Sequence, residues 1–149
     1  MHRLLALACL VAISGTAAGQ SPTDQSAAPL PSVALPPGLD RVLRDYERAW
    51  TARDPGALSL LFTEDGFVLA SGRPPVRGRS AIREVYRNSG GPLALRALAY
   101  ATADTIGYIV GAFATAPGGP DVGKFVLPIR RDPSGRWLIA ADIDNGNSR

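Results

Sequence analysis

The sequence predicts an α+β domain, a cone-shaped fold of three N-terminal helices packed on a curved antiparallel sheet. The first half of the chain shows helical periodicity with capping and stop signals, whereas the second half consists of apolar, β-rich segments separated by turn residues. Helices followed by a meander of strands are typical of this class. Three helices covering one curved sheet would leave a cone-shaped hollow, where we expect a ligand.

Two segments precede this domain. Residues 1–19 have a basic start, an apolar run of about ten residues and a small-residue end, which is the pattern of a secretory signal peptide. We expect cleavage near Ala18 or Gly19. The run is too short to span a membrane, so we expect a mature chain without a membrane span, in the periplasm or outside the cell. Residues 20–38 are rich in Pro, Ser and Ala and predict a disordered lead, so the domain is expected over 39–149.

The composition excludes several kinds of chemistry. Signal cleavage would remove the only histidine and the only cysteine, His2 and Cys9. The mature chain alone then has no disulfide, no cysteine nucleophile, no Ser-His-Asp triad and no His/Cys zinc site, and we expect neither a metal nor a cofactor. Loss of Arg3 lowers the net charge from +3 to +2, spread along the chain. Nucleic acid is therefore not an expected partner.

The first half of the domain predicts two helices. In 39–50, apolar residues recur at helical spacing while charged residues fill the opposite face, which indicates an amphipathic helix. Asp54 followed by Pro55 is an N-cap with proline at the first helical position. This pair predicts a short second helix that continues through Phe62.

The remaining elements follow from turn and capping signals. A strand candidate, 66–71, precedes a third helix that Ser80 is predicted to cap and that Gly90-Gly91-Pro92 ends. Beyond this point the periodicity changes to that of strands. Turn residues separate four predicted strands, which are 93–103, 106–116, 123–131 and 136–144.

Two stretches resemble a known superfamily. The segment Tyr46–Leu95, with AWTARDPGALSLLFTEDGFV and VRGRSAIREVYRNS, is similar to the ketosteroid isomerase and SnoaL-like polyketide cyclase superfamily, which shares the nuclear transport factor two fold. The tail, GKFVLPIRRDPSGRWLIAADIDNGN, looks most like its uncharacterised bacterial branch, a domain of unknown function. The resemblance implies a cone with a ligand pocket and a homodimer. It does not imply one reaction, because function resides in the site rather than the fold.

The resemblance also argues against ordinary ketosteroid isomerisation. In the isomerases, a tyrosine of helix one and a protonated aspartic acid form an oxyanion hole, while another aspartate moves the proton. Tyr46 matches that tyrosine. Ala70 and Leu127 stand at about the positions of the base and the protonated acid. Whether the chain is an enzyme therefore stays open.

The last predicted strand combines an apolar pattern with two carboxylates. Regular alternation puts the aspartates on one face of the strand together with two apolar residues, and only apolar residues on the other face. The first face consists of Leu138, Ala140, Asp142 and Asp144, and the second of Trp137, Ile139, Ala141 and Ile143.

The hairpin register decides which of these faces is buried. A loop of Asp132 to Gly135 would pair Phe125 with Asp142. A three-residue loop with Gly135 left-handed would instead put Lys124 and Val126 on the aspartates' face. Both registers remain possible from the sequence.

The resemblance favours an inward Asp142, deep in the pocket, with Asp144 near the mouth. Burial would raise the pKa of Asp142, so that it could act as a general acid or base beside the hydroxyl of Tyr46. Alternatively, Asp142 only pairs with Lys124 or an arginine, or caps the backbone at the sheet edge. The predicted catalytic residues are Asp142 and Tyr46, and the other predicted pocket residues are Trp50, Tyr86, Phe125, Leu127, Ala140 and Asp144.

Three functions remain open at this point. The leading hypothesis is an exported, homodimeric domain that binds a small, mainly apolar molecule. The second is an isomerase, cyclase or epoxide-opening enzyme that uses Asp142 and Tyr46. The third is a protein-interaction module whose cone is filled by phenylalanines, namely Phe62, Phe67, Phe113 and Phe125.

Overall fold

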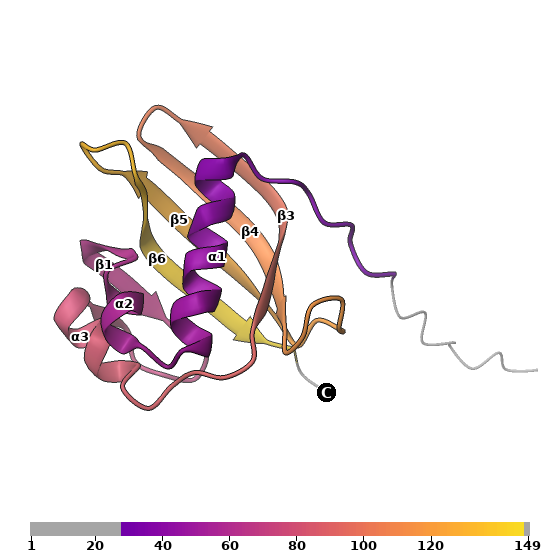
Figure 1. Ribbon diagram of the computed structural model, residues 1–149, viewed down its shortest axis with the longest axis horizontal. Helices are drawn as coiled ribbons and strands as arrows, with labels where there is room; N and C mark the ends of the chain where they lie inside the picture. The colour runs from indigo at the N-terminus through magenta and orange to yellow at the C-terminus, as the bar shows by residue number, and fades with distance from the viewer. Residues whose placement is uncertain (1–27, 148–149) are drawn as a thin grey trace, which may run out of the picture.

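The computed structural model describes residues 28–147. A long helix, α1 (Pro37–Thr51), lies over one face of a six-stranded sheet, and two short helices lie beside β1 at one end (Figure 1). The predicted α+β class is confirmed. The predicted signal peptide, 1–19, lies outside the described residues. Within 28–147, no helix is long and apolar enough to cross a membrane.

The sheet is mixed, with the strand order β2-β1-β6-β5-β4-β3. Its β3 to β6 meander is antiparallel as predicted, but β1 pairs with β6 in parallel. The first and last strands of the main sheet thus lie side by side, although they are far apart in the chain. The elements after α1 are α2 (Pro55–Ser59), β1 (Phe62–Leu69), β2 (Val76–Arg77), α3 (Arg79–Val85), β3 (Ala94–Ala103), β4 (Ile106–Ala114), β5 (Gly123–Arg131) and β6 (Trp137–Gly146).

Two predicted boundaries are corrected by the structure. The second helix ends at Ser59, and Phe62 instead begins β1, where it is fully buried and pairs with Ile139. Helix propensity is a weak preference that burial in the sheet overrides here. At the third helix, Gly78 occupies the N-cap position in place of the predicted Ser80.

Helix α1 directs its apolar face into the sheet, as its spacing predicts. Pro37 stands at the start of the helix, where its missing N–H needs no partner. On the outer face, Arg44 forms ion pairs with Asp40 and Glu47. The buried residues of the helix are Leu39, Val42, Leu43, Tyr46 and Ala49.

The predicted disordered lead, 20–38, differs from the structure in its last part. Its final two residues belong to α1. The backbone N–H of Val33 donates to the carbonyl of Ala97 at 2.9 Å, and the side chain of Arg96 donates to the carbonyl of Leu30 at 2.7 Å. Strand β3 is a sheet edge with unpaired backbone groups, and this segment satisfies part of that edge. Composition alone does not reveal such a partner.

A β-bulge in β6 decides which way the aspartates point. Near the turn, Ile129 pairs with Ile139, whereas farther along Phe125 pairs with Asp144. Between these pairs, β6 contains one residue more than β5. The extra residue reverses the alternation, so Asp142 and Asp144 lie on the same face as Ile139, beneath the helices.

Neither predicted register holds along the whole hairpin. The pairing near the turn is the one expected from a three-residue loop, and Gly135 is left-handed with a φ of 84°. Beyond the bulge, Phe125 shares the aspartates' face, as expected from the other register. The prediction that Leu138 and Ala140 share a face with the two aspartates is therefore wrong, because a bulge interrupts regular alternation.

Candidate functional site

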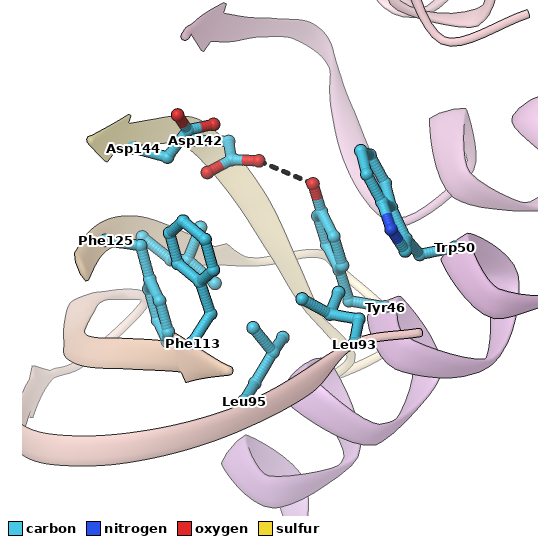
Figure 2. Close-up of a pocket in the computed structure, with 9 residues that line it drawn as sticks. Tyr46, Trp50, Leu93, Leu95, Phe113, Phe125, Asp142 and Asp144 are labelled. Carbon is cyan, nitrogen blue, oxygen red and sulfur yellow. Dashed lines mark hydrogen bonds between the residues drawn. The ribbon is translucent and has the colours of Figure 1, made fainter. Parts of the chain in front are cut away.

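A cavity of about 230 Å³ lies between α1 and the sheet. This volume exceeds the roughly 150 Å³ of a cavity that holds benzene, and it is below the roughly 300 Å³ at the lower end of drug-sized sites. The space suits a molecule of one or two rings. The residues that line it, shown in Figure 2, are Tyr46, Trp50, Leu93, Leu95, Phe113, Phe125, Leu127, Asp142 and Asp144.

Two glycines keep the strand side of the cavity open. Gly111 pairs with Phe125, and Gly123 pairs with Phe113. A Cβ atom at either glycine would overlap the ring of its partner. Each ring can therefore lie close to the sheet over a glycine, which leaves room between the rings and α1.

Asp142 is the most deeply buried carboxylate of this site. The residue is only 3% exposed. The hydroxyl of Tyr46 donates a hydrogen bond to Oδ2 of Asp142 at 2.8 Å, and the hydroxyl of Tyr86 donates to the same oxygen at 3.3 Å. Figure 2 shows the bond from Tyr46 and the other carboxylate oxygen directed away from it. Asp142 thus has two partners from the helical layer on one oxygen.

An aromatic cluster holds the two tyrosines in place. Trp50, one turn after Tyr46 on α1, stacks on that tyrosine with a centroid distance of 6.1 Å. The same indole makes an edge contact with Tyr86 at 5.6 Å. Such contacts favour a fixed geometry over several rotamers. The two hydroxyls, 3.5 Å apart, converge on Asp142 as a result.

Burial raises the pKa of Asp142 to about 6. The hydrogen bond from Tyr46 acts in the opposite direction, the charge of Asp144 raises this pKa further, and the bond from Tyr86 lowers it. Burial together with the charge of Asp142 raises the pKa of both tyrosines well above the usual value. The tyrosines are therefore neutral hydrogen-bond donors near pH 7, while Asp142 titrates close to it.

Asp144 lies on the same face, between the main cavity and a second hollow. It is half-buried, and burial raises its pKa, while a backbone hydrogen bond at Ser71 and the charge of Arg73 oppose the rise. The second hollow, of about 250 Å³, lies beside the β1–β2 loop and shares Trp50 and Asp144 with the main cavity. Arg73 lines only this second hollow.

Most residues predicted for the pocket lie around one cavity. Six do so, namely Tyr46, Trp50, Phe125, Leu127, Asp142 and Asp144. Tyr86 lies behind Asp142 and lines the second hollow instead. Ala140, on the bulge of β6, does not line the cavity. The predicted alternative partner of Asp142, Lys124, is exposed and binds Asn147.

Sequence reasoning missed three residues of the cavity wall. Leu93 lies just before β3 and Leu95 lies near its start, and their spacing of two residues was the available signal for a shared face. Phe113 was expected only as a filler of the cone. It lines the cavity together with Phe125, whereas Phe62 and Phe67 do not, so the predicted filled cone is not observed.

The positions of the expected isomerase acids are apolar in the structure. Leu127 is a wall of the main cavity, and Ala70 lines the second hollow. Among residues 28–147, no group of three or more His, Cys, Asp or Glu side chains is arranged to hold a metal ion. The residues of the cavity wall with polar side-chain groups are Tyr46, Trp50, Asp142 and Asp144.

Comparison with known proteins shows the fold. The chain is similar to a ketosteroid isomerase-like protein from Erwinia carotovora atroseptica (TM-score 0.64, 19% identity, covering 74% of this chain and 94% of that one). An NTF-2 like protein of unknown function from Shewanella oneidensis gives a TM-score of 0.59 at 19% identity, covering 72% and 95%. A putative calcium/calmodulin dependent protein kinase II association domain from Xanthomonas campestris gives 0.62 at 14% identity, covering 79% and 95%.

These likenesses confirm, at the level of the fold, the superfamily resemblance predicted from the sequence. Another solved structure of similar shape, from Novosphingobium aromaticivorans, is described as an ntf2-like protein with a cystatin-like fold. No protein-family model matches the sequence, and no curated protein does.

We expect Asp142→Asn to flatten the pH dependence of stability. The pKa of about 6 in the folded state lies above the ordinary value of 3.8, so folding favours the protonated acid. The resulting stabilisation of the folded state is fully present below about pH 4 and is lost as the pH rises through about 6. The wild-type free energy of unfolding should fall by about 3 kcal/mol from this group over that range, as measured by urea unfolding at a series of pH values.

Asp104→Asn is the matched control. Asp104 lies exposed in the β3–β4 turn with a φ of 50°, a conformation that asparagine also tolerates. This variant should keep the wild-type slope between about pH 4 and 7. Equal slopes in Asp142→Asn and the wild type would contradict the buried titration.

Proposed function

We propose that this chain, which has the fold of the nuclear transport factor two-like proteins, is an exported domain that binds a small, mainly apolar molecule in the cavity beneath α1. The observation that supports the proposal is the cavity itself, in which six of nine lining residues are Trp, Phe or Leu. Such an apolar hollow with a few convergent polar groups is typical of ligand sites. Export is argued from the secretory pattern of residues 1–19, and N-terminal sequencing of the mature protein tests it.

Toluene, naphthalene and indole are suitable first ligands for the proposal. At concentrations well above its dissociation constant, a ligand that fits should raise the Tm by at least about 2 °C, because binding stabilises only the folded state. Leu95→Trp should abolish the shift by filling the cavity. The same change at Leu60, an exposed residue that does not line the cavity, is the control. Absence of any shift or of ligand density in a soaked crystal would count against the proposal.

A second candidate function is general acid–base catalysis by Asp142. The buried carboxylate with a pKa of about 6, held by the Tyr46 hydroxyl at 2.8 Å, favours it. In an isomerase, cyclase or epoxide-opening reaction, the ionised form would accept a proton from the ligand and the neutral form would donate one. Because the hydroxyl of Tyr46 is directed at Asp142, this tyrosine would position the acid and could donate to a ligand only after moving.

Proton exchange tests this candidate without knowledge of the substrate. Acetophenone in D₂O should exchange its methyl protons faster with the wild type than without protein, and the rate should rise with pH through about 6 as Asp142 ionises. Asp142→Asn should lower the protein-dependent rate by about 10²-fold or more, while Asp104→Asn leaves it unchanged. Equal rates for wild type and Asp142→Asn by NMR would exclude this role.

The outer face of the sheet favours a homodimer. Ile109 and Leu127 face the core, so the alternate residues Tyr108, Val110 and Val126 lie on the opposite face. Tyr108 there is 43% exposed, and two other apolar residues on the same face, Ile106 and Ile143, are 60% and 39% exposed. Apolar patches of this kind are typical of protein interfaces. The Xanthomonas campestris and Thiobacillus denitrificans neighbours are described as putative association domains, which also supports assembly of this chain with a second copy.

Light scattering after size-exclusion chromatography measures this assembly. We expect twice the chain mass for the wild type and the mass of one chain for Tyr108→Asp, because a charge at the centre of an apolar interface is costly to bury. Tyr100→Asp is the control, since Tyr100 pairs with Ile109 and lies on the other face. A monomeric wild type at micromolar concentration would overturn the dimer.

A further inference from the structure

The polar end of the cavity has carboxylates but no basic side chain. Of the nine lining residues, Asp142 and Asp144 are the two carboxylates, and none is Lys, Arg or His. The nearby cation is Arg73 of the β1–β2 loop, which acts on Asp144 from the second hollow. With both aspartates ionised, these three groups sum to one negative charge, located where the cavity meets β6. An anionic ligand group would be repelled there.

One oxygen of Asp142 is available to a ligand. Asp142 accepts hydrogen bonds from two described side chains, Tyr46 and Tyr86, and both bonds end on Oδ2. The polar atoms that are fully occluded and also lack a hydrogen-bond partner do not include Oδ1 of Asp142. This oxygen, to which neither tyrosine donates, is therefore not sealed off from the cavity. In Figure 2 this second oxygen is turned toward the part of the cavity where Phe113 and Phe125 lie. A ligand donor near these rings would reach it.

The walls next to this oxygen are aromatic. Tyr46, Trp50, Phe113 and Phe125 contribute four rings to a small cavity. The faces of aromatic rings carry partial negative charge and attract cations within about 6 Å, most strongly where water is excluded. A hydroxyl or a carbonyl gains little from such walls. The rings and the two carboxylates therefore favour the same kind of ligand group.

We propose that the ligand of this cavity is a small organic amine, bound as its ammonium ion against Oδ1 of Asp142 and the carboxylate of Asp144, with its apolar body among the phenyl rings. This inference rests on the proposed ligand-binding function and names the class of molecule. The ammonium donates hydrogen bonds to carboxylates that otherwise repel one another in a poorly hydrated site. An amine of one or two rings matches the volume of about 230 Å³.

The proposal links binding to protonation. Asp142 faces Tyr46 from α1, Tyr86 from the end of α3 and Asp144 from β6, while Arg73 faces Asp144. The tyrosines stay neutral, so Asp142 is the group that changes charge near pH 6. An ammonium ion favours its ionised form. Amine affinity should therefore rise as the pH increases through about 6, and binding below that pH should release a proton.

Four matched molecules separate the possible ligand classes: benzylamine, benzyl alcohol, toluene and sodium benzoate. Calorimetry of the mature protein with each, at about pH 5 and about pH 8, measures the affinities, and an alkyl amine stays protonated at both values. At pH 8 we expect benzylamine to bind at least about tenfold more tightly than benzyl alcohol and toluene, and benzoate not to bind. At pH 5 the affinity for benzylamine should be lower, and that for toluene unchanged.

Variants of the two carboxylates show whether charge is the cause. Asp142→Asn should lose most of the preference for benzylamine over toluene, together with the pH dependence of benzylamine binding. Asp144→Asn should reduce the preference as well, which gives a second test if the first variant is unstable. Asp104→Asn removes the same charge from the exposed β3–β4 turn and should behave as the wild type.

The outcomes distinguish this inference from the function on which it rests. Benzyl alcohol, toluene or benzoate binding as tightly as benzylamine would overturn the amine and leave the apolar binding site in place. Benzylamine affinity that does not change between the two pH values would also overturn it, because the ammonium would then not contact Asp142. If none of the four binds, and toluene, naphthalene and indole give no thermal shift, both proposals fail.

Discussion

The burial of the Asp142 carboxylate under two tyrosine hydroxyls is the interaction on which this site depends. A carboxylate removed from water is costly unless hydrogen bonds replace its hydration. Here those bonds come from separate parts of the helical layer, Tyr46 on α1 and Tyr86 at the end of α3, and both reach one oxygen. The acid therefore connects the helices to β6 near the middle of the sheet. The same contacts that fix the position of the helices also set the proton affinity of the acid.

The carboxylate reaches this place only because β6 is irregular. A strand with strict alternation would direct Asp142 away from the face that Ile139 shares with the core. One extra residue on β6 between the Ile129–Ile139 and Val126–Ile143 pairs turns the remainder of the strand over. The first part of the strand thus serves the core, and the second part serves the cavity. Bulges next to functional sites commonly redirect a side chain in this way.

The hollow itself is a packing feature of the sheet. Two phenyl rings occupy space above Gly111 and Gly123, where any larger residue would push them toward α1. Interiors are close-packed as a rule, so a cavity persists only where such side chains cannot fill it. The walls that result are aromatic and aliphatic, while the ionisable groups gather at one end. The cavity is thus electronegative at one end and apolar elsewhere. A ligand with one polar end would therefore bind in a single orientation.

The sequence by itself determined the elements and the residue types of the site. The helical spacing of α1 and the turn residues between β3 and β6 are local or pattern information, which a one-dimensional reading retains, whereas the placement of Asp142 beside Tyr46 was favoured only by the family resemblance. Tertiary structure alone decided the parallel pairing of β1 with β6, the bulge, and the place of Tyr86 behind Asp142. Leu93 and Phe113 joined the cavity for the same reason. Each of these depends on contacts between segments distant in the chain, whose packing energy outweighs local preference and cannot be read from any one of the segments.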